Sequence, residues 1–177
     1  HYVICWIGNN DALSAALSYG NLNASQLTSV ADFERDYRTL VDRLAPLIDV
    51  HGSRVVFVNI PDVSSIGFLV DKPSVEAFFG QPVAMPEGSA TTLVALILMA
   101  FLGDPGLLQS PDFVLDANEI ALIRNRIADF NQIIAAEAAR VGMPVVDMNA
   151  RFAEFLVNPP VFSGTPVGPQ FTRGLLS

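Results

Sequence analysis

The chain has 177 residues, of which 51% are hydrophobic and 16% charged, and its net charge is −8 at pH 7. This length suits one domain with a large core, and the negative charge, with no cluster of Lys or Arg, argues against nucleic-acid binding. The longest unbroken apolar run, Leu93–Leu102, has ten residues, whereas a membrane span needs about 20, so we expect no membrane crossing.

The first expected element is an apolar strand over residues 2–7, which runs directly into Gly8-Asn9-Asn10-Asp11. A helix over residues 12–17 is expected to follow at once. At a junction of this kind, backbone N–H groups and the positive end of the helix dipole favour an anionic guest. The carboxamides of Asn9 and Asn10 are therefore held where they could donate hydrogen bonds to an anion.

A helix–glycine–strand unit comes next. Ser29 can cap the helix and Gly52 follows its end. Residues 54–60 then form a nearly continuous apolar run, which predicts a buried strand that Pro61 ends. The apolar helix face, at steps of three and four, consists of Phe33, Tyr37, Leu40, Leu44 and Leu47.

A second unit repeats this order. Asp116 and Glu119 form a capping pair ahead of a long helix, Gly142 ends that helix, and residues 144–148 form a short strand. The helix face comprises Ile120, Ile123, Ile127, Phe130, Ile134, Ala138 and Val141. The alternation predicts an α/β fold in which three parallel strands lie side by side in chain order, with helices on both faces.

Residues 64–110 interrupt this alternation and are too long for an ordinary loop. Proline and glycine divide the segment into short pieces, and Thr92–Leu102 should be a hydrophobic helix. That helix could be the core of an insertion, or a lid or acyl-chain wall over an active site. The proline-rich tail over residues 158–174 is expected to be a surface loop.

Polar residues follow each expected strand, and ligands of open parallel sheets bind outside the carboxyl ends of the strands. The candidates are Gly8–Asp11 after the first strand, Asn59, Pro61 and Asp62 after the second, and Asp147 and Asn149 after the third. Asp11, Asp62 and Asp147 could alternatively bind magnesium, as in a metal-dependent phosphohydrolase.

The Gly-x-Asn-Asp pattern between a strand and a helix resembles the third sequence block of the SGNH (GDSL-type) serine hydrolases. The run N-I-P-D-V at residues 59–63 and a helix with Asn131 and Ile134 are similar to bacterial members. The resemblance implies a flavodoxin-like three-layer domain that cleaves small-molecule or lipid esters, without a metal or organic cofactor. It makes Asn10 the catalytic oxyanion donor, places Gly8, Asn9, Asp11 and Pro61 around the substrate, and implies a periplasmic or secreted protein.

The rest of a hydrolase site is expected to lie outside the chain. No serine occurs in a Gly-Asp-Ser motif, and His1 and His51 flank the amino ends of strands, ~20 Å from Asn10. A general base must reach its proton within ~3 Å or through one water. We therefore expect residues 1–177 to be one partial domain, inactive alone, with the nucleophile block upstream and an Asp-x-x-His block after Ser177. The alternative is a non-catalytic flavodoxin-like binding module.

The strand over residues 2–7 should also be exposed at one edge of the sheet. In the resembled family another strand pairs with it, and none is expected in this chain. A hydrophobic edge with unpaired N–H and C=O groups is a template for another chain. We therefore expect the isolated chain to be insoluble, to self-associate through residues 2–7, or to occur only together with the rest of its domain.

Overall fold

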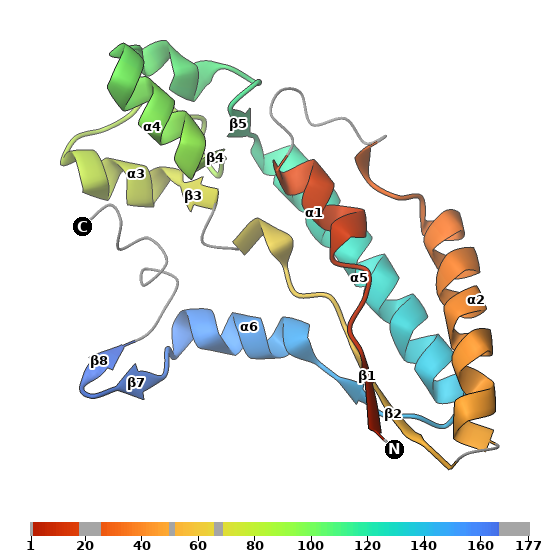
Figure 1. The fold of residues 1–177 in the computed structure, drawn as a ribbon. Helices are drawn as coiled ribbons and strands as arrows, with labels where there is room; N and C mark the ends of the chain where they lie inside the picture. Colours follow the sequence, from red (N-terminus) through yellow and green to blue (C-terminus); the bar gives the residue numbers. More distant parts are fainter. Residues whose placement is uncertain (1, 18–25, 50–51, 66–68, 167–177) are drawn as a thin grey trace.

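A computed structural model describes residues 2–17, 26–49, 52–65 and 69–166, and the description below concerns these residues. The protein is mixed α/β (Figure 1). Its central sheet contains β1 (Tyr2–Cys5), β2 (Arg54–Val58) and β6 (Val145–Val146), in the order β1-β2-β6. Both pairs are parallel, with Cys5 opposite Phe57 and Phe57 opposite Val145. The expected three parallel strands in chain order are confirmed, although each strand is shorter than predicted.

Three helices match the predicted helical segments. They are α1 (Asn10–Leu17), α2 (Val30–Asp49) and α5 (Ala117–Arg140). The Ser29 hydroxyl accepts a hydrogen bond from the backbone N–H of Asp32 at 3.0 Å, so Ser29 caps α2 as expected. Asp116 and Glu119 form the predicted capping box at the start of α5. Local sequence therefore sets where these two long helices begin.

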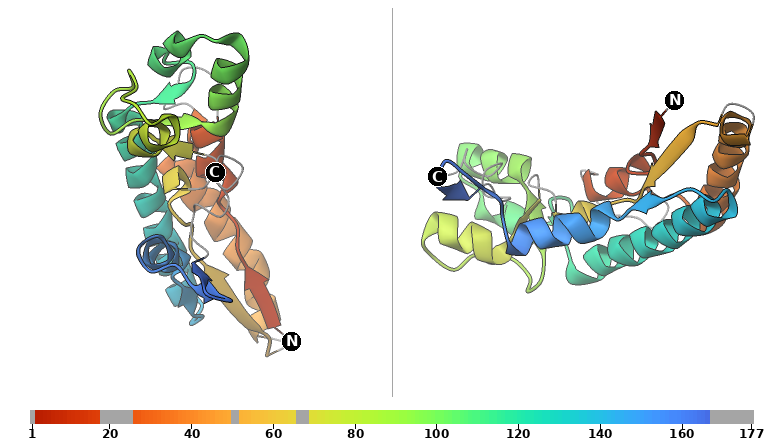
Figure 2. Two further views of the ribbon diagram at one scale, coloured as in Figure 1. Left: turned by 90° about the vertical axis from the view of Figure 1, so that its left-hand side faces the viewer. Right: turned by 90° about the horizontal axis from the view of Figure 1, so that it is seen from below.

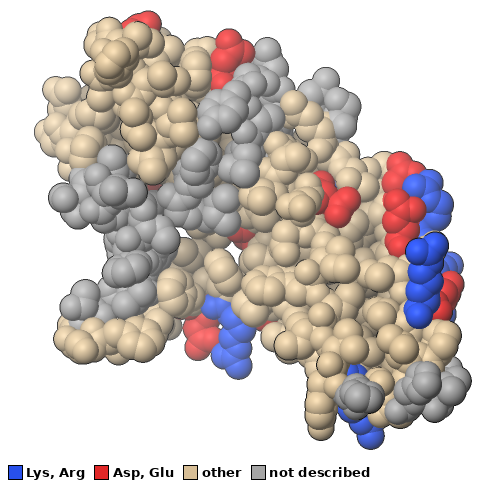
Figure 3. Space-filling view, viewed as in Figure 1, with Lys and Arg blue, Asp and Glu red and all other residues tan. Residues whose placement is uncertain are grey.

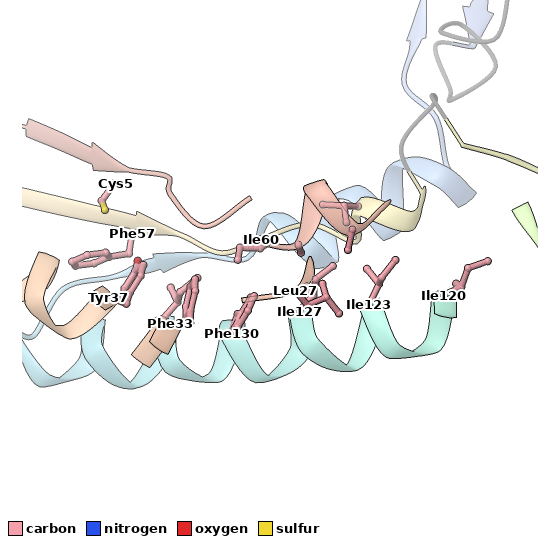
Figure 4. Close-up of a cluster of buried hydrophobic side chains, with 14 of the residues drawn as sticks. Cys5, Leu27, Phe33, Tyr37, Phe57, Ile60, Ile120, Ile123, Ile127 and Phe130 are labelled. Atoms are coloured by element: carbon pink, nitrogen blue, oxygen red, sulfur yellow. The ribbon is translucent and has the colours of Figure 1, made fainter. Parts of the chain in front are cut away.

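The main core lies between one face of this sheet and helices α2 and α5 (Figure 4). The ring of Phe33 stacks on that of Phe130 with centroids 4.0 Å apart, and Phe33 also stacks on Tyr37 at 5.4 Å. Phe57 of β2 is fully buried against this group. The alternate residues of each strand on this face therefore anchor the sheet to the two long helices.

The opposite face of β1 differs from the expectation of helices on both faces. Tyr2 is 86% exposed and Ile4 is 73% exposed, whereas Cys5, which points to the other face, is buried. Among the described residues, nothing buries these two side chains. Helix α5 runs along one side of the strands (Figure 2). The parallel sheet is thus covered on one face only along β1.

The α2–α5 seam also contains a buried carboxylate. Glu137 is 3% exposed, and its two oxygens accept hydrogen bonds from Arg38 at 2.9 Å and from Arg140 at 2.7 Å. Arg140 reaches on to Asp42 at 2.7 Å. These side chains connect α2 and α5, whose packed rings lie further along the same seam.

The expected insertion forms a small unit beyond the N-terminal end of α5 (Figure 1). Its sheet is antiparallel in the order β3-β4-β5, from β3 (Leu69–Asp71), β4 (Ala90–Thr92) and β5 (Val114–Leu115). Its helices are α3 (Lys72–Phe79), α4 (Leu93–Leu102) and the 3₁₀ helix η3 (Pro105–Gln109). A separate core holds the unit together, consisting of Val70, Val75, Met85, Leu96, Leu108 and Val114. The predicted helix over residues 92–102 is α4, which Thr92 caps.

The end of the described chain differs from the prediction. The strand expected over residues 144–148 has only two residues, because Asp147 caps a helix not predicted from the sequence, α6 (Met148–Val157). The expected tail loop contains a short hairpin, β7 (Val161–Phe162) with β8 (Thr165–Pro166). No described helix is both long and apolar enough to cross a bilayer.

Candidate functional site

The junction between β1 and α1 contains Gly8, and the geometry there requires a glycine. Its φ is +108°, a conformation that other residues rarely adopt. A Cβ atom at this position would lie 2.8 Å from Cδ1 of Ile60 and 3.0 Å from the Phe33 ring. The chain can therefore turn from β1 into α1 against the core only because residue 8 has no side chain.

Asn10 is the first residue of α1 and is exposed. The N–H groups of Asp11 and Ala12 donate to the carbonyl oxygens of Gly8 and Asn9, at 3.1 and 3.3 Å. The Asn10 carboxamide and backbone N–H make no hydrogen bond to another described residue. Asn10 is thus placed at a helix start with donors directed to no other described group, a geometry suited to an anionic oxygen.

Asp11 fixes the start of α1 to the segment before α2. One of its carboxylate oxygens accepts a hydrogen bond from the Thr28 hydroxyl at 2.7 Å, and its carbonyl accepts from the Thr28 N–H at 3.3 Å. Arg126 of α5 donates in turn to the Thr28 carbonyl. Asp11 therefore has a positioning contact in this structure and is not directed at the same point as Asn10.

The ends of β2 and β6 are joined by side chains. The side-chain N–H₂ of Asn59 donates to Asp147 at 2.8 Å, and its side-chain oxygen Oδ1 accepts from the Asn149 N–H at 2.9 Å. The Ala150 N–H and the Asn59 amide hold the pKa of Asp147 below its ordinary value, because both donate to the charged carboxylate. The sequence placed these three residues at one edge of the sheet, and the structure brings them into contact.

Ile60 and Pro61 continue the chain beyond β2 and are both buried. The Asn131 carboxamide of α5 accepts from the Ile60 N–H at 2.8 Å and donates to its carbonyl at 2.9 Å. The Asn131 side chain therefore makes the two hydrogen bonds to the Ile60 backbone that a neighbouring strand would otherwise make. Pro61 lies in the chain between Ile60 and Asp62, and little of its ring is exposed.

Asp62 forms a cluster that sequence reasoning missed. One of its oxygens accepts from the Ser64 hydroxyl and N–H, at 2.6 and 2.9 Å, and the other accepts from Arg124 of α5 at 2.9 Å. Arg124 is 62 residues away in the sequence, and nothing local marks it as a partner. In the sequence, the two consecutive serines after the strand, Ser64 and Ser65, were the signal that could have indicated hydrogen-bond donors near Asp62.

A cavity of about 520 Å³ lies beside this cluster. It is lined by Ser64 and Ser65 of η2 (Val63–Ser65), Ser89 before β4, and Arg124 of α5. Asn10 is not among its lining residues. The cavity and the Asn10 carboxamide are therefore separate features, with η2 packed against α1.

The three aspartates considered as a magnesium site have separate partners: Asp11 has Thr28, Asp62 has Arg124, and Asp147 has Asn59. In the described ranges, no group of three His, Cys, Asp or Glu residues is arranged to hold a metal ion. His1 and His51 lie outside the described residues. Ser163 is exposed in the β7–β8 turn.

Comparison with protein-family models, with curated proteins and with solved structures finds no match for this chain.

Proposed function

We propose that this chain is part of an SGNH (GDSL-type) carboxylic ester hydrolase, in which Asn10 donates a hydrogen bond to the oxyanion of the tetrahedral intermediate. One observation carries the proposal. Asn10 is exposed at the start of α1, which follows the parallel strand β1 after residues 6–9, and its carboxamide has no partner among the described residues. A neutral donor fixed before the reaction stabilises developing negative charge without reorganisation.

The surrounding residues support this placement. Gly8 lets the chain turn with φ +108° against Ile60 and Phe33, and Asp11 holds the start of α1 through Thr28. A donor on a rigid support retains its direction during the reaction, which is what an oxyanion hole needs. On the family resemblance, Asn9 and Pro61 are proposed to lie beside the substrate. The substrate is proposed to be a small-molecule or lipid ester, and the reaction needs no metal or organic cofactor.

The nucleophile, acid and base are proposed to lie in segments outside residues 1–177, with a Gly-Asp-Ser block upstream and an Asp-x-x-His block downstream. A serine there would attack the ester carbonyl, and the histidine would take its proton. We also propose a periplasmic or secreted location, on the same family resemblance.

The test uses a longer protein that carries this chain with both blocks. Asn10→Ala should lower kcat by about 10²–10³-fold with little change in KM, because an oxyanion donor acts mainly in the transition state. Asn118→Ala is the matched control, since Asn118 is an exposed asparagine in the first turn of α5, and it should leave kcat unchanged.

The 177-residue chain alone should not hydrolyse p-nitrophenyl esters above background. Turnover by this chain, abolished by a serine-directed phosphonate, would contradict the placement of the nucleophile elsewhere. An unchanged kcat in Asn10→Ala would overturn the oxyanion role itself.

A non-catalytic binding module is the second candidate, and the cavity of about 520 Å³ beside Arg124 favours it. Its volume lies in the range of small-molecule sites. In that case a longer protein would have no Gly-Asp-Ser block and no esterase activity. The phosphohydrolase alternative is not proposed, because the three aspartates bind separate partners in the described structure.

A further inference from the structure

A second cavity, of about 410 Å³, lies in the insertion between α3, α4 and η3. Its walls include Phe79 of α3, Val83 of the following loop, Met99 of α4 and Leu108 of η3. Gln81 is the one lining residue with a polar side chain. Small-molecule sites have volumes of roughly 300–1,000 Å³ and mostly apolar walls with few polar groups, which describes this cavity.

The helices that line this cavity also expose large apolar side chains. Phe101 is 85% exposed and Ile97 is 57% exposed on α4, and Phe78 is 47% exposed on α3. Helix α4 has the sequence L-V-A-L-I-L-M-A-F-L, without a polar residue. Apolar surface gathered in this way marks an interaction site more often than scattered exposed residues do.

The charges near the cavity limit what can bind there. No Lys or Arg occurs between residues 73 and 123, whereas this segment contains several acidic residues. In the view of Figure 3, the end of the molecule formed by α3 and α4 shows no Lys or Arg. Lys72, at the start of α3, already pairs with Glu76 and Glu87, and no Lys or Arg lines the cavity. A carboxylate, sulfate or phosphate head group would therefore lack a counter-ion in the cavity wall and would be repelled by the acidic residues. The preferred occupant is therefore apolar and uncharged.

We propose that this cavity binds a single aliphatic chain of an uncharged lipid or long-chain alcohol. The apolar walls contact the aliphatic chain, and Met99 and Ala100 are the residues of α4 that line the cavity. None of the lining residues belongs to the strand ends that position Asn10, so the proposal does not depend on ester hydrolysis. The chain would be bound by the insertion as a ligand, at a site separate from Asn10.

The test measures binding of the uncharged fluorescent probe N-phenyl-1-naphthylamine to the 177-residue chain, and its displacement by 1-decanol and by decanoate. 1-Decanol should displace the probe at a concentration about tenfold lower than decanoate, because only decanoate carries a charge. Ala84→Asp and Ala100→Trp change exposed residues that line the cavity. The first adds a charge and the second adds bulk, and each should weaken probe binding by about tenfold or more.

Phe101→Ser is the matched control, because Phe101 is exposed on the same helix but does not line the cavity. This variant should retain probe binding, and all variants should unfold cooperatively in urea. Loss of binding in Phe101→Ser with normal binding in Ala100→Trp would overturn the proposal in favour of adsorption to the helix surface. Equal displacement by decanoate would also overturn it. Light scattering is done on the Ile4→Lys variant, in which the added charge on β1 opposes association through that strand. Probe binding that appears in this variant only with a doubling of mass would assign the surface to a second copy.

Discussion

Gly8 shows how much of the candidate site depends on a single residue. The positive φ alone would disfavour other residues, and the space for a Cβ is occupied by Ile60 and Phe33. Sequence reasoning could identify Gly8 through its motif, but the two side chains that surround it come from distant segments. The motif indicated that a turn was needed there, and the packing explains why the turn is rigid.

Gly8→Ala should destabilise the protein by about 3 kcal/mol, because it combines backbone strain with a steric clash. Gly142→Ala is the matched control: Gly142 also has a positive φ, +66°, but a Cβ there would meet nothing within 4 Å. It should cost about 1 kcal/mol, from strain alone. The free energies of unfolding of both variants are measured in urea and compared with that of the wild type. Equal losses would show that the packing around Gly8 adds nothing.

The side chains around the strand ends could be predicted in part. Asn59, Asp147 and Asn149 follow parallel strands, and the carboxyl ends of such strands meet at one edge, so their proximity followed from topology. The pairing of Asp62 with Arg124 could not be predicted, because it depends on how α5 is rotated against η2. The sequence around a residue in the middle of a helix does not indicate which loop that residue contacts.

At the scale of elements, the two long helices α2 and α5 were predicted well and short strands poorly. The capping box at Asp116 and the apolar face of α5 are local patterns, so sequence alone predicts them. Strands β3, β4 and β5 have two or three residues each and pair across long separations. Such strands are too short to show an alternating pattern, and their pairing depends on the tertiary fold.

Helix α6 was missed because Asp147 was interpreted only as a residue at the end of a strand. It is also the N-cap of α6, since its side chain accepts from the Ala150 N–H at 2.9 Å. Asp147 thus ends β6 after two residues and starts the next helix. A single residue with both roles explains why the predicted strand was too long.

Asp147 should contribute a pH-dependent part of the stability. Its pKa in the folded state lies below the ordinary 3.8, because the Ala150 N–H and the Asn59 amide donate to the charged form. The contribution is therefore present above the ordinary pKa and is lost as the pH falls through the folded-state value. Asp147→Ala should lower the urea midpoint at pH 7, and the gap to the wild type should narrow below pH ~4. A gap that stays constant down to pH ~2 would contradict this.

At the scale of the whole molecule, the central sheet ends at β1, and no other described strand pairs with its outer side. Strand β1 lies at the edge of the sheet, and Tyr2 and Ile4 are exposed on its open face. This edge was predicted from the resemblance to the SGNH family, in which a further strand pairs with the strand over residues 2–7. An edge strand with unpaired backbone groups and an apolar face is a site for pairing with another chain.

We expect the 177-residue chain to self-associate through β1. Ile4→Lys should shift the protein toward the monomer in light scattering, because a charge on an edge strand opposes strand pairing. Val157→Lys is the matched control, since Val157 is 77% exposed but lies at the end of α6, and it should leave the association unchanged. A monodisperse wild-type monomer with slow amide exchange at Val3 and Cys5 would contradict the prediction.

The buried Glu137 between α2 and α5 has a consequence for how the sequence can change during evolution. Arg38 and Arg140 bind opposite oxygens of the same carboxylate, so one arginine can still compensate its charge when the other is replaced. Losing both leaves a buried charge without a partner, which costs more than the two single losses together. Replacement of Glu137 by an apolar residue removes that penalty. Positions 38, 137 and 140 are therefore expected to vary together among related sequences, with the carboxylate lost before the second arginine.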